Sequence, residues 1–215
     1  MSKHGSFGKA RKALLTAYRA AADARLIGGQ SGNLSLRVEE GMLITPSGAR
    51  AETCTEERLV AMMLDGTVWP GAKGRPSSEW AMHAAIYEAF PEADAILHAH
   101  SDAATALACL NEGLPAFHYM VTRFGGAEIA CAPYVTFGTP ALAEVAIAAL
   151  GPRRACLLAN HGVIVHGKDA PSVLADAMLL ETLARQYLLA RAAGTPRLLS
   201  AQEIADAVER FRDYG

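Results

Sequence analysis

Three histidines are spaced so that they could share one metal ion. His98 and His100 flank a single alanine in the apolar stretch AILHAHSD, residues 95–102. Because alternate side chains of a strand point to the same face, a strand here would aim both imidazoles at one place. His161 follows in ANHGV, where Gly162 permits a turn that aims the imidazole inward. Three protein ligands with a fourth position open are typical of catalytic zinc. Two polar residues on a solvated strand face explain the His98–His100 pair equally well.

Glu79 could carry a proton or help to hold an anion. It follows two serines in PSSEW, at the start of an expected helix. The free N–H groups of a helix start favour an anion, and the hydroxyls of Ser77 and Ser78 would add donors. A capping box, in which Ser and Glu satisfy the helix end, is the simpler interpretation of these residues alone. His83, farther along the same helix, is interpreted as structural.

Two further turns are rich in small residues and hydrogen-bond donors. They are SGN at 31–33, with Gly32 and Asn33, and TPSG at 45–48, with Ser47 and Gly48. Such loops form anion-binding nests, although the ends of hairpins have the same composition. Three donor-rich segments without a basic cluster would suit a phosphate monoester held by backbone N–H groups and hydroxyls.

Composition narrows the class of protein. The chain has 215 residues and a formal net charge of −2, with no Lys/Arg block, which argues against nucleic acid or an anionic membrane as a general partner. No apolar run approaches the roughly 20 residues that span a bilayer. Four cysteines without CxxC spacing indicate reduced thiols in a cytoplasmic protein. The length favours one domain over residues 1–215.

The expected elements place strands in the middle of the chain and helices at both ends. This order predicts a single α/β domain whose central sheet, mostly antiparallel or mixed, is flanked by helices. Helices are expected over 7–27, 77–90, 103–110, 141–150, 171–193 and 201–211; a hairpin over 34–45, strands over 60–64, 95–100 and around 154–166, and short strands and loops over 116–140.

Eight ordered segments together resemble the class II aldolase/adducin family, and in particular its L-fuculose-1-phosphate aldolase branch. The resemblance covers about residues 25–215. Its segments are SGNLSLRV, GMLITPSG, PSSEWAMHAAIY, AILHAHS, PAFHYM, CAPYVTFGT, LLANHGVIV and ERFRDYG.

The resemblance implies a zinc-dependent aldolase, usually a cyclic homotetramer with active sites between subunits. Three imidazoles also suit Co²⁺, Mn²⁺ or iron. Glu79 is then the general acid/base and can also bind the metal when substrate is absent. Tyr119 is the tyrosine that a neighbouring subunit offers to the aldehyde, and Tyr214 is a mobile tyrosine that helps close the site. The implied metal ligands are His98, His100 and His161, and the implied phosphate site is Gly32, Asn33, Ser47, Gly48, Ser77 and Ser78.

The reaction implied is reversible cleavage of a ketose 1-phosphate, a small-molecule sugar phosphate, to dihydroxyacetone phosphate and an aldehyde. The ketose is fuculose 1-phosphate or a 5-deoxy- or 5-methylthio-pentulose 1-phosphate. Gln30, where the family commonly has Thr, and the bulky stretch Thr122–Phe124 put fuculose phosphate itself in question. The same fold hosts a sugar-phosphate 4-epimerase and a methylthioribulose-1-phosphate dehydratase. Adducin-type modules lack the metal triad, which is complete here.

Overall fold

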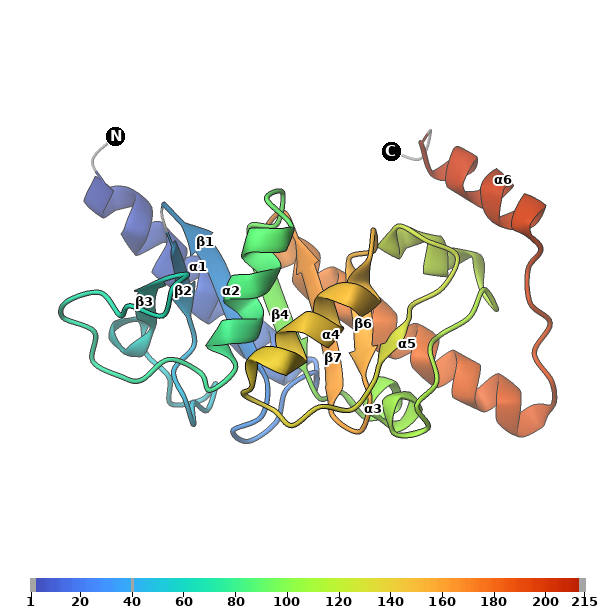
Figure 1. The fold of residues 1–215 in the computed structure, drawn as a ribbon, viewed down its shortest axis with the longest axis horizontal. Coiled ribbons are helices and arrows are strands. Elements are labelled where there is room, and N and C mark those ends of the chain that lie inside the picture. The colour runs from blue at the N-terminus through green and yellow to red at the C-terminus, as the bar shows by residue number, and fades with distance from the viewer. Residues whose placement is uncertain (1–2, 40, 213–215) are drawn as a thin grey trace.

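Seven strands form one sheet in the computed structural model, which describes residues 3–39 and 41–212 (Figure 1). The strand order is β3-β2-β1-β4-β7-β6-β5, and only β5 and β6 run parallel. This confirms the mostly antiparallel, mixed sheet predicted from the sequence. The strands are β1 (Asn33–Val38), β2 (Gly41–Ile44), β3 (Val60–Met63), β4 (Ala95–Ala99), β5 (Cys131–Ala132), β6 (Ala155–Leu158) and β7 (Gly162–Gly167).

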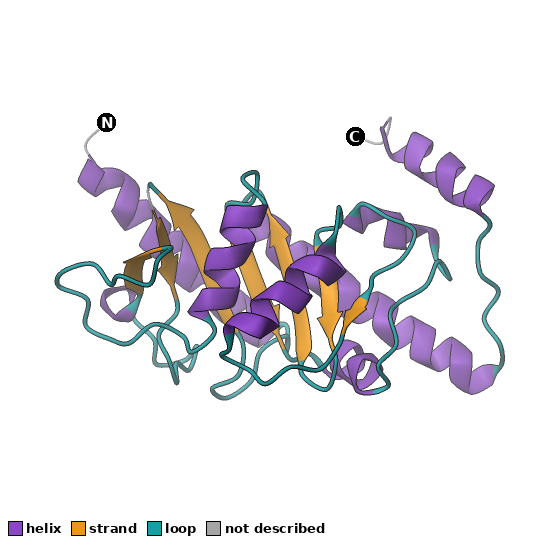
Figure 2. Cartoon of the chain, viewed as in Figure 1, coloured by secondary structure: helices purple, strands orange, loops and turns teal. Residues whose placement is uncertain are grey.

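Helices cover both faces of the sheet, so the molecule has three layers (Figures 1 and 2). Helices α2 (Trp80–Ala89) and α4 (Pro140–Leu150) pack on one face and bury the apolar cluster that includes Ile96 and Ile164. On the other face lie α1 (Lys3–Asp23), α3 (Asp102–Cys109) and α5 (Ala170–Ala193), over the larger cluster. The sheet therefore has an apolar cluster on each of its faces, as expected for a sheet covered by helices on both sides.

Strand β4 lies at the centre of the sheet, between β1 and β7. Leu97 faces the layer of α1, α3 and α5, whereas Ile96 faces α2 and α4. His98 alternates in the same way and points to the α2 side. Its register partners are Asn33 on β1 and Ile164 on β7. The central position explains why His98 is fully buried.

The first helix ends earlier than the sequence indicates. It was expected to reach Gly28–Gly29, but α1 ends at Asp23. Arg25 adopts a left-handed φ of 58°, and Leu26 N–H then bonds back to the helix. Burial of Leu26 and Ile27 takes the chain down to the sheet before the glycines are reached.

The aromatic stretch 116–140 contains less strand than expected. It forms the 3₁₀ helix η2 (Tyr119–Phe124) and only the short strand β5. Another 3₁₀ turn, η1 (Glu56–Arg58), precedes β3. Helix α6 (Ala201–Arg212) packs against η2 after an extended connection from α5 (Figure 1). Among the described helices, none combines the length and the apolar character needed to cross a membrane.

Candidate metal centre and phosphate pocket

The three histidines predicted to share a metal ion lie together in the fold. Ring centroids are 4.7 Å apart for His98 and His100, 4.8 Å for His98 and His161, and 5.0 Å for His100 and His161. One nitrogen from each ring lies within 4.8 Å of the others. His100 follows the last residue of β4, and His161 precedes the first residue of the neighbouring β7. Strand pairing therefore brings the distant histidine to the pair.

The protonation pattern leaves His98 ready to bind a cation. Its Nδ1 lies 2.8 Å from the carbonyl oxygen of Val163, to which it must donate. Nε2 is therefore the nitrogen of His98 that remains to bind a cation, and it lies 2.8 Å from Nε2 of His100. Burial lowers the pKa of His100 to about 4, so the His100 imidazole is neutral.

Glu79 reaches the same place from the other side. Its Oε2 lies 3.1 Å from Nε2 of His98, and its Oε1 lies 3.2 Å from Nε2 of His161. The capping box considered for this residue is not formed, because the N-cap makes no side-chain cap bond. Burial by itself would raise the pKa of Glu79, but His98 and His161 outweigh it and hold that pKa below its ordinary value. A metal cation held by these imidazoles would act on the carboxylate in the same direction.

These residues fit a divalent metal ion. Imidazole nitrogens with one carboxylate oxygen are the donors found in zinc and other transition-metal sites. Nδ1 of His161 is buried with no hydrogen-bond partner, and neither Lys nor Arg is among the described residues that line the adjoining cavity. A cation bound here would therefore contact imidazole lone pairs and the Glu79 carboxylate, with no Lys or Arg among the described lining residues to repel it.

The phosphate residues predicted from three separate segments line one cavity of about 280 Å³. The turn at Ser47 and the turn at Ser77 are held side by side, because Pro46 and Pro76 form a β-bridge. Two backbone bonds reinforce it, Ser47 N–H to Arg75 O and Ser77 N–H to Thr45 O. The lining includes Gly32, Asn33, Ser47, Gly48, Ser77 and Ser78, together with Glu79, His100 and His161.

Glycine is required at two positions near this cavity. Gly32 has φ +76°, and a Cβ there would lie 2.4 Å from Ile27 Cγ2. A Cβ on Gly162 would lie 2.4 Å from Ala99 O and 2.8 Å from Cδ2 of His100. The turn before β7 was attributed to Gly162, but Asn160 has the left-handed conformation, with φ 53°. Gly162 is needed for close approach to His100.

The side-chain amide of Asn33, which lines the cavity, is engaged within the protein. Its side-chain amide donates to Oε2 of Glu79 at 2.9 Å, and its Oδ1 faces Nε2 of His83 at 2.5 Å. Both ends of this amide are thus occupied within the protein. Sequence reasoning missed His83 as a neighbour of the site; its position one helical turn after Glu79 was the available signal. It also missed Phe137, an exposed cavity residue in VTFGTP.

Tyr119 lines a different cavity from the one beside the three histidines of the same chain. Tyr119 is half exposed and lines a second cavity with Arg123 and Phe211, whose lining contains none of the three histidines. Tyr214 lies outside the described residues. Phe124 was expected to affect an aldehyde pocket, but it is fully buried in the core. Within Thr122–Phe124, only Arg123 is exposed.

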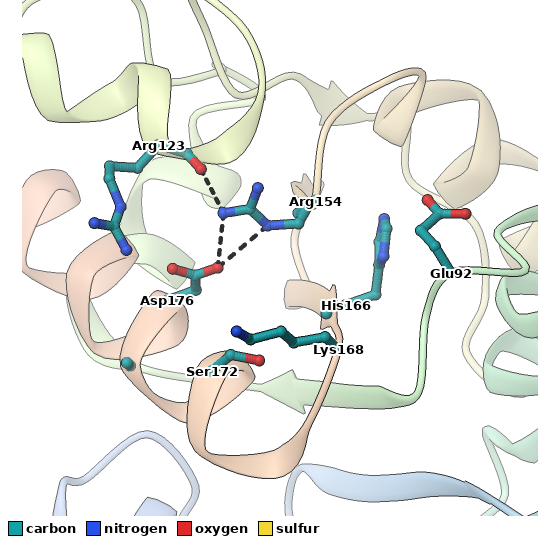
Figure 3. Close-up of a pocket in the computed structure, with 9 residues that line it drawn as sticks. Glu92, Arg123, Arg154, His166, Lys168, Ser172 and Asp176 are labelled. Carbon is teal, nitrogen blue, oxygen red and sulfur yellow. Dashed lines mark hydrogen bonds and ion pairs between the residues drawn. The ribbon is translucent and has the colours of Figure 1, made fainter. Parts of the chain in front are cut away.

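Another cavity, of about 450 Å³, lies at the opposite end of β7 (Figure 3). Arg154 occupies its centre, paired with Asp176 at 3.1 Å and donating to the backbone oxygen of Arg123. The buried His166 and the exposed Lys168 also line it. The Arg154–Asp176 pair neutralises part of the charge in this cavity, and it fastens α5 to the residue that precedes β6.

A model of the class II aldolase and adducin N-terminal domain matches residues 12–188. The chain belongs to the class II aldolase and adducin family. The family resemblance drawn from the sequence motifs is therefore confirmed.

Relatives within the family share most of the chain. A 5-methylthioribulose-1-phosphate/5-deoxyribulose-1-phosphate aldolase from Rhodospirillum rubrum is 40% identical over 205 residues, covering 95% of this chain and 92% of the relative. An L-fuculose phosphate aldolase from Escherichia coli K12 is 43% identical over 188 residues, covering 87% and 86%. A solved structure of an L-fuculose 1-phosphate aldolase superposes with a TM-score of 0.90 at 36% identity, covering 95% of this chain and 96% of that one.

Proposed function

We propose that this protein is a metal-dependent aldolase that reversibly cleaves a ketose 1-phosphate to dihydroxyacetone phosphate and an aldehyde. The observation that carries the proposal is a single cavity whose lining includes His100, His161 and Glu79 together with three donor-rich turns. A phosphate ester held by the turns would place its neighbouring carbons beside the histidines and the carboxylate. The aldolases named among the relatives support the same reaction class.

The turns would bind the phosphate without basic side chains. Neither Lys nor Arg is among the described lining residues. The Ser47 hydroxyl is exposed beside Gly48, and Ser78 is exposed on the turn that the Pro46–Pro76 bridge holds next to them. Hydroxyl and backbone N–H donors from converging turns satisfy an anion in this way. Anchoring the phosphate orients the rest of the substrate for reaction.

Glu79 would move the proton at the carbon from which the aldehyde departs. Its carboxylate is buried and held at the histidines, and the low pKa keeps it ionised as a base. Bound at His98, His100 and His161, a divalent cation supplies Lewis-acid stabilisation where cleavage leaves negative charge. Zinc is the metal that we propose, because this donor set suits it.

We further propose that four copies assemble with their active sites between subunits. Tyr119 is half exposed and separate from the histidines of its own chain, which leaves it free to serve a neighbouring site. In this arrangement Tyr119 exchanges the proton of the aldehyde oxygen, and Tyr214 helps to close the site. The proposal also includes one domain over residues 1–215, in the cytoplasm.

The substrate class includes fuculose 1-phosphate and the 5-deoxy- and 5-methylthio-pentulose 1-phosphates. Burial of Phe124 removes the argument that its ring favours the less polar aldehydes. Relatives of both substrate classes are similarly close in identity, 40% and 43%. We therefore propose the shared chemistry, cleavage of a ketose 1-phosphate, as the function.

A sugar-phosphate panel with the metal-loaded protein tests the proposal. Fuculose 1-phosphate, both pentulose 1-phosphates and ribulose 5-phosphate are incubated separately, and dihydroxyacetone phosphate is detected by coupled NADH oxidation. We expect release of dihydroxyacetone phosphate from at least one ketose 1-phosphate. Chelation should abolish release, and added divalent metal should restore it.

Other products would replace this function with a different one. An epimerised pentulose would indicate the 4-epimerase, and a diketone would indicate the dehydratase. Full cleavage by metal-free protein would contradict the metal requirement. Loss of metal binding in His98→Ala, with metal binding retained in the control variant His166→Ala, would locate the ion at the three imidazoles.

A further inference from the structure

A chain of buried side chains leads from Glu79 into the core between α2 and the sheet. Asn33 Nδ2 donates to Oε2 of Glu79 at 2.9 Å, and Asn33 Oδ1 lies 2.5 Å from Nε2 of His83. Nδ1 of His83 lies 2.7 Å from Oγ of Ser35, which lies 2.9 Å from the hydroxyl of Tyr87. All five side chains are buried.

The carboxylate fixes the direction of every bond in this chain. An ionised carboxylate only accepts, so the NH₂ group of Asn33 must face Glu79 and its oxygen must face His83. His83 must then donate from Nε2, which leaves Nδ1 to accept from Ser35. The Ser35 hydroxyl in turn accepts from Tyr87. Reversing any one bond would leave two donors or two acceptors facing each other.

The surroundings of His83 and Tyr87 suit these roles. Burial, aided by the nearby His98, lowers the pKa of His83 to about 3, so the ring stays neutral with one N–H. Burial raises the pKa of Tyr87, which keeps its hydroxyl protonated as a donor. Arg37 stacks over the Tyr87 ring with its guanidinium carbon 4.7 Å from the centroid, which holds the far end of the chain in place.

We propose that His83 is a positioning residue for Glu79, and that it acts by donating from Nε2 to Asn33 so that the Asn33 amide presents its NH₂ group to the carboxylate. This inference rests on the proposed function, in which Glu79 transfers the proton. Without the His83 donor, the buried oxygen of Asn33 loses its partner and the amide is no longer held at both ends. Its NH₂ group can then move away from Oε2 of Glu79, and the carboxylate loses the donor that holds it beside His98.

The first test reads the tautomer of His83 in the unmodified, metal-loaded protein. Imidazole ¹⁵N chemical shifts distinguish a ring protonated at Nε2 from one protonated at Nδ1 or at both nitrogens. We expect His83 to be neutral and protonated at Nε2. A proton on Nδ1 would overturn the proposal, whatever reaction the protein catalyses.

The second test isolates the proton transfer. Proton NMR follows the exchange of the dihydroxyacetone phosphate C–H in deuterium oxide, with no aldehyde present. This exchange reports on the proton transfer assigned to Glu79, separately from carbon–carbon cleavage. His83→Leu should slow this exchange by about 10–100-fold, the loss typical when a supporting partner of a site is removed. His83→Gln, whose amide NH₂ can take the place of Nε2–H, should recover most of the rate. Metal content and inhibition by inorganic phosphate should stay the same in both variants.

A second buried histidine provides the matched control. His166 is 2% exposed and bonds Arg153 O, at the opposite end of the sheet from Glu79. His166→Leu should leave exchange within about threefold of the unmodified protein. Equal exchange in His83→Leu and the unmodified protein would overturn the proposal, as would equal impairment of His83→Leu and His83→Gln. Absence of exchange in the unmodified, metal-loaded protein would instead count against the proposed function.

Discussion

Oε2 of Glu79 lies 3.1 Å from Nε2 of His98, although the two side chains come from the start of helix α2 and from strand β4. The other carboxylate oxygen lies 3.2 Å from Nε2 of His161. A carboxylate this close to two candidate ligand nitrogens can serve as a proton carrier, as a metal ligand, or as each in turn. The first prediction separates these roles.

Glu79→Gln should abolish most turnover while leaving the metal in place. The three imidazoles remain as ligands, so metal content should stay near one ion per chain. Loss of the base should slow cleavage by about 10²–10⁴-fold. Metal analysis and kcat measure the two effects, and Glu88→Gln, an exposed change on the same helix, serves as the control. Loss of metal together with turnover would mean that Glu79 is an essential ligand.

Gly162→Ala should weaken metal binding without unfolding the protein. The added methyl would lie 2.8 Å from Cδ2 of His100 and 2.4 Å from Ala99 O, so the imidazole must move. We expect metal affinity to fall by at least about tenfold, as for other changes that disturb ligand orientation. Competition with a chromogenic chelator measures the affinity, and circular dichroism monitors the fold. Gly194→Ala, which has open space around it, should bind metal normally.

Ser47→Ala should weaken binding of the phosphate group more than it slows the reaction. The hydroxyl is exposed at the cavity and the Ser47 N–H is already bonded to Arg75 O, so only the side-chain donor is lost. A lost hydrogen bond to a charged group is worth about 1.5–3 kcal/mol, which predicts a rise in KM of roughly 10–150-fold. Inhibition by inorganic phosphate should weaken in parallel. Thr195→Ala, which removes an exposed hydroxyl outside the cavity, should behave like the unmodified protein.

Mixed oligomers should recover activity that neither parent possesses. If Tyr119 serves a neighbouring subunit, His161→Ala and Tyr119→Phe damage different halves of each site. In oligomers formed at random from equal amounts of the two variants, about one quarter of the sites are restored. These are the sites that combine an intact His161 from one subunit with an intact Tyr119 from its neighbour. Activity after co-refolding, measured against the separate variants, checks this. Activity equal to the average of the two parents would place Tyr119 in the site of its own chain.

Glu181→Ala should lower the free energy of unfolding by about 1–2 kcal/mol, the range for loss of a helix cap. Its two carboxylate oxygens accept from the backbone N–H groups of Ala103 and Ala104, each at 2.9 Å, and so satisfy the start of α3. Ser101, the N-cap residue of α3, makes no side-chain cap bond. Urea unfolding measures the change, with the exposed Glu144→Ala as the control. An unchanged midpoint would show that solvent satisfies these groups equally well.

The sequence by itself determined the features that depend on local geometry. The His98–His100 pair could be assigned to one side of a strand because side chains alternate along it. The turns at Gly32 and Ser47 were identifiable because small residues mark tight turns in any fold. Apolar periodicity likewise indicated individual helices and strands. Each of these inferences needs only a few consecutive residues.

The tertiary structure decided everything that depends on which distant segments meet. Pairing of β4 with β7 brought His161 to the other two histidines. Packing of α2 on the sheet placed the Glu79 carboxylate beside His98 and His161. The same packing committed the Asn33 amide to Glu79 and His83. Hydrogen bonds between side chains far apart in the chain leave no periodic signal, because their partners are fixed by the register and docking of whole elements.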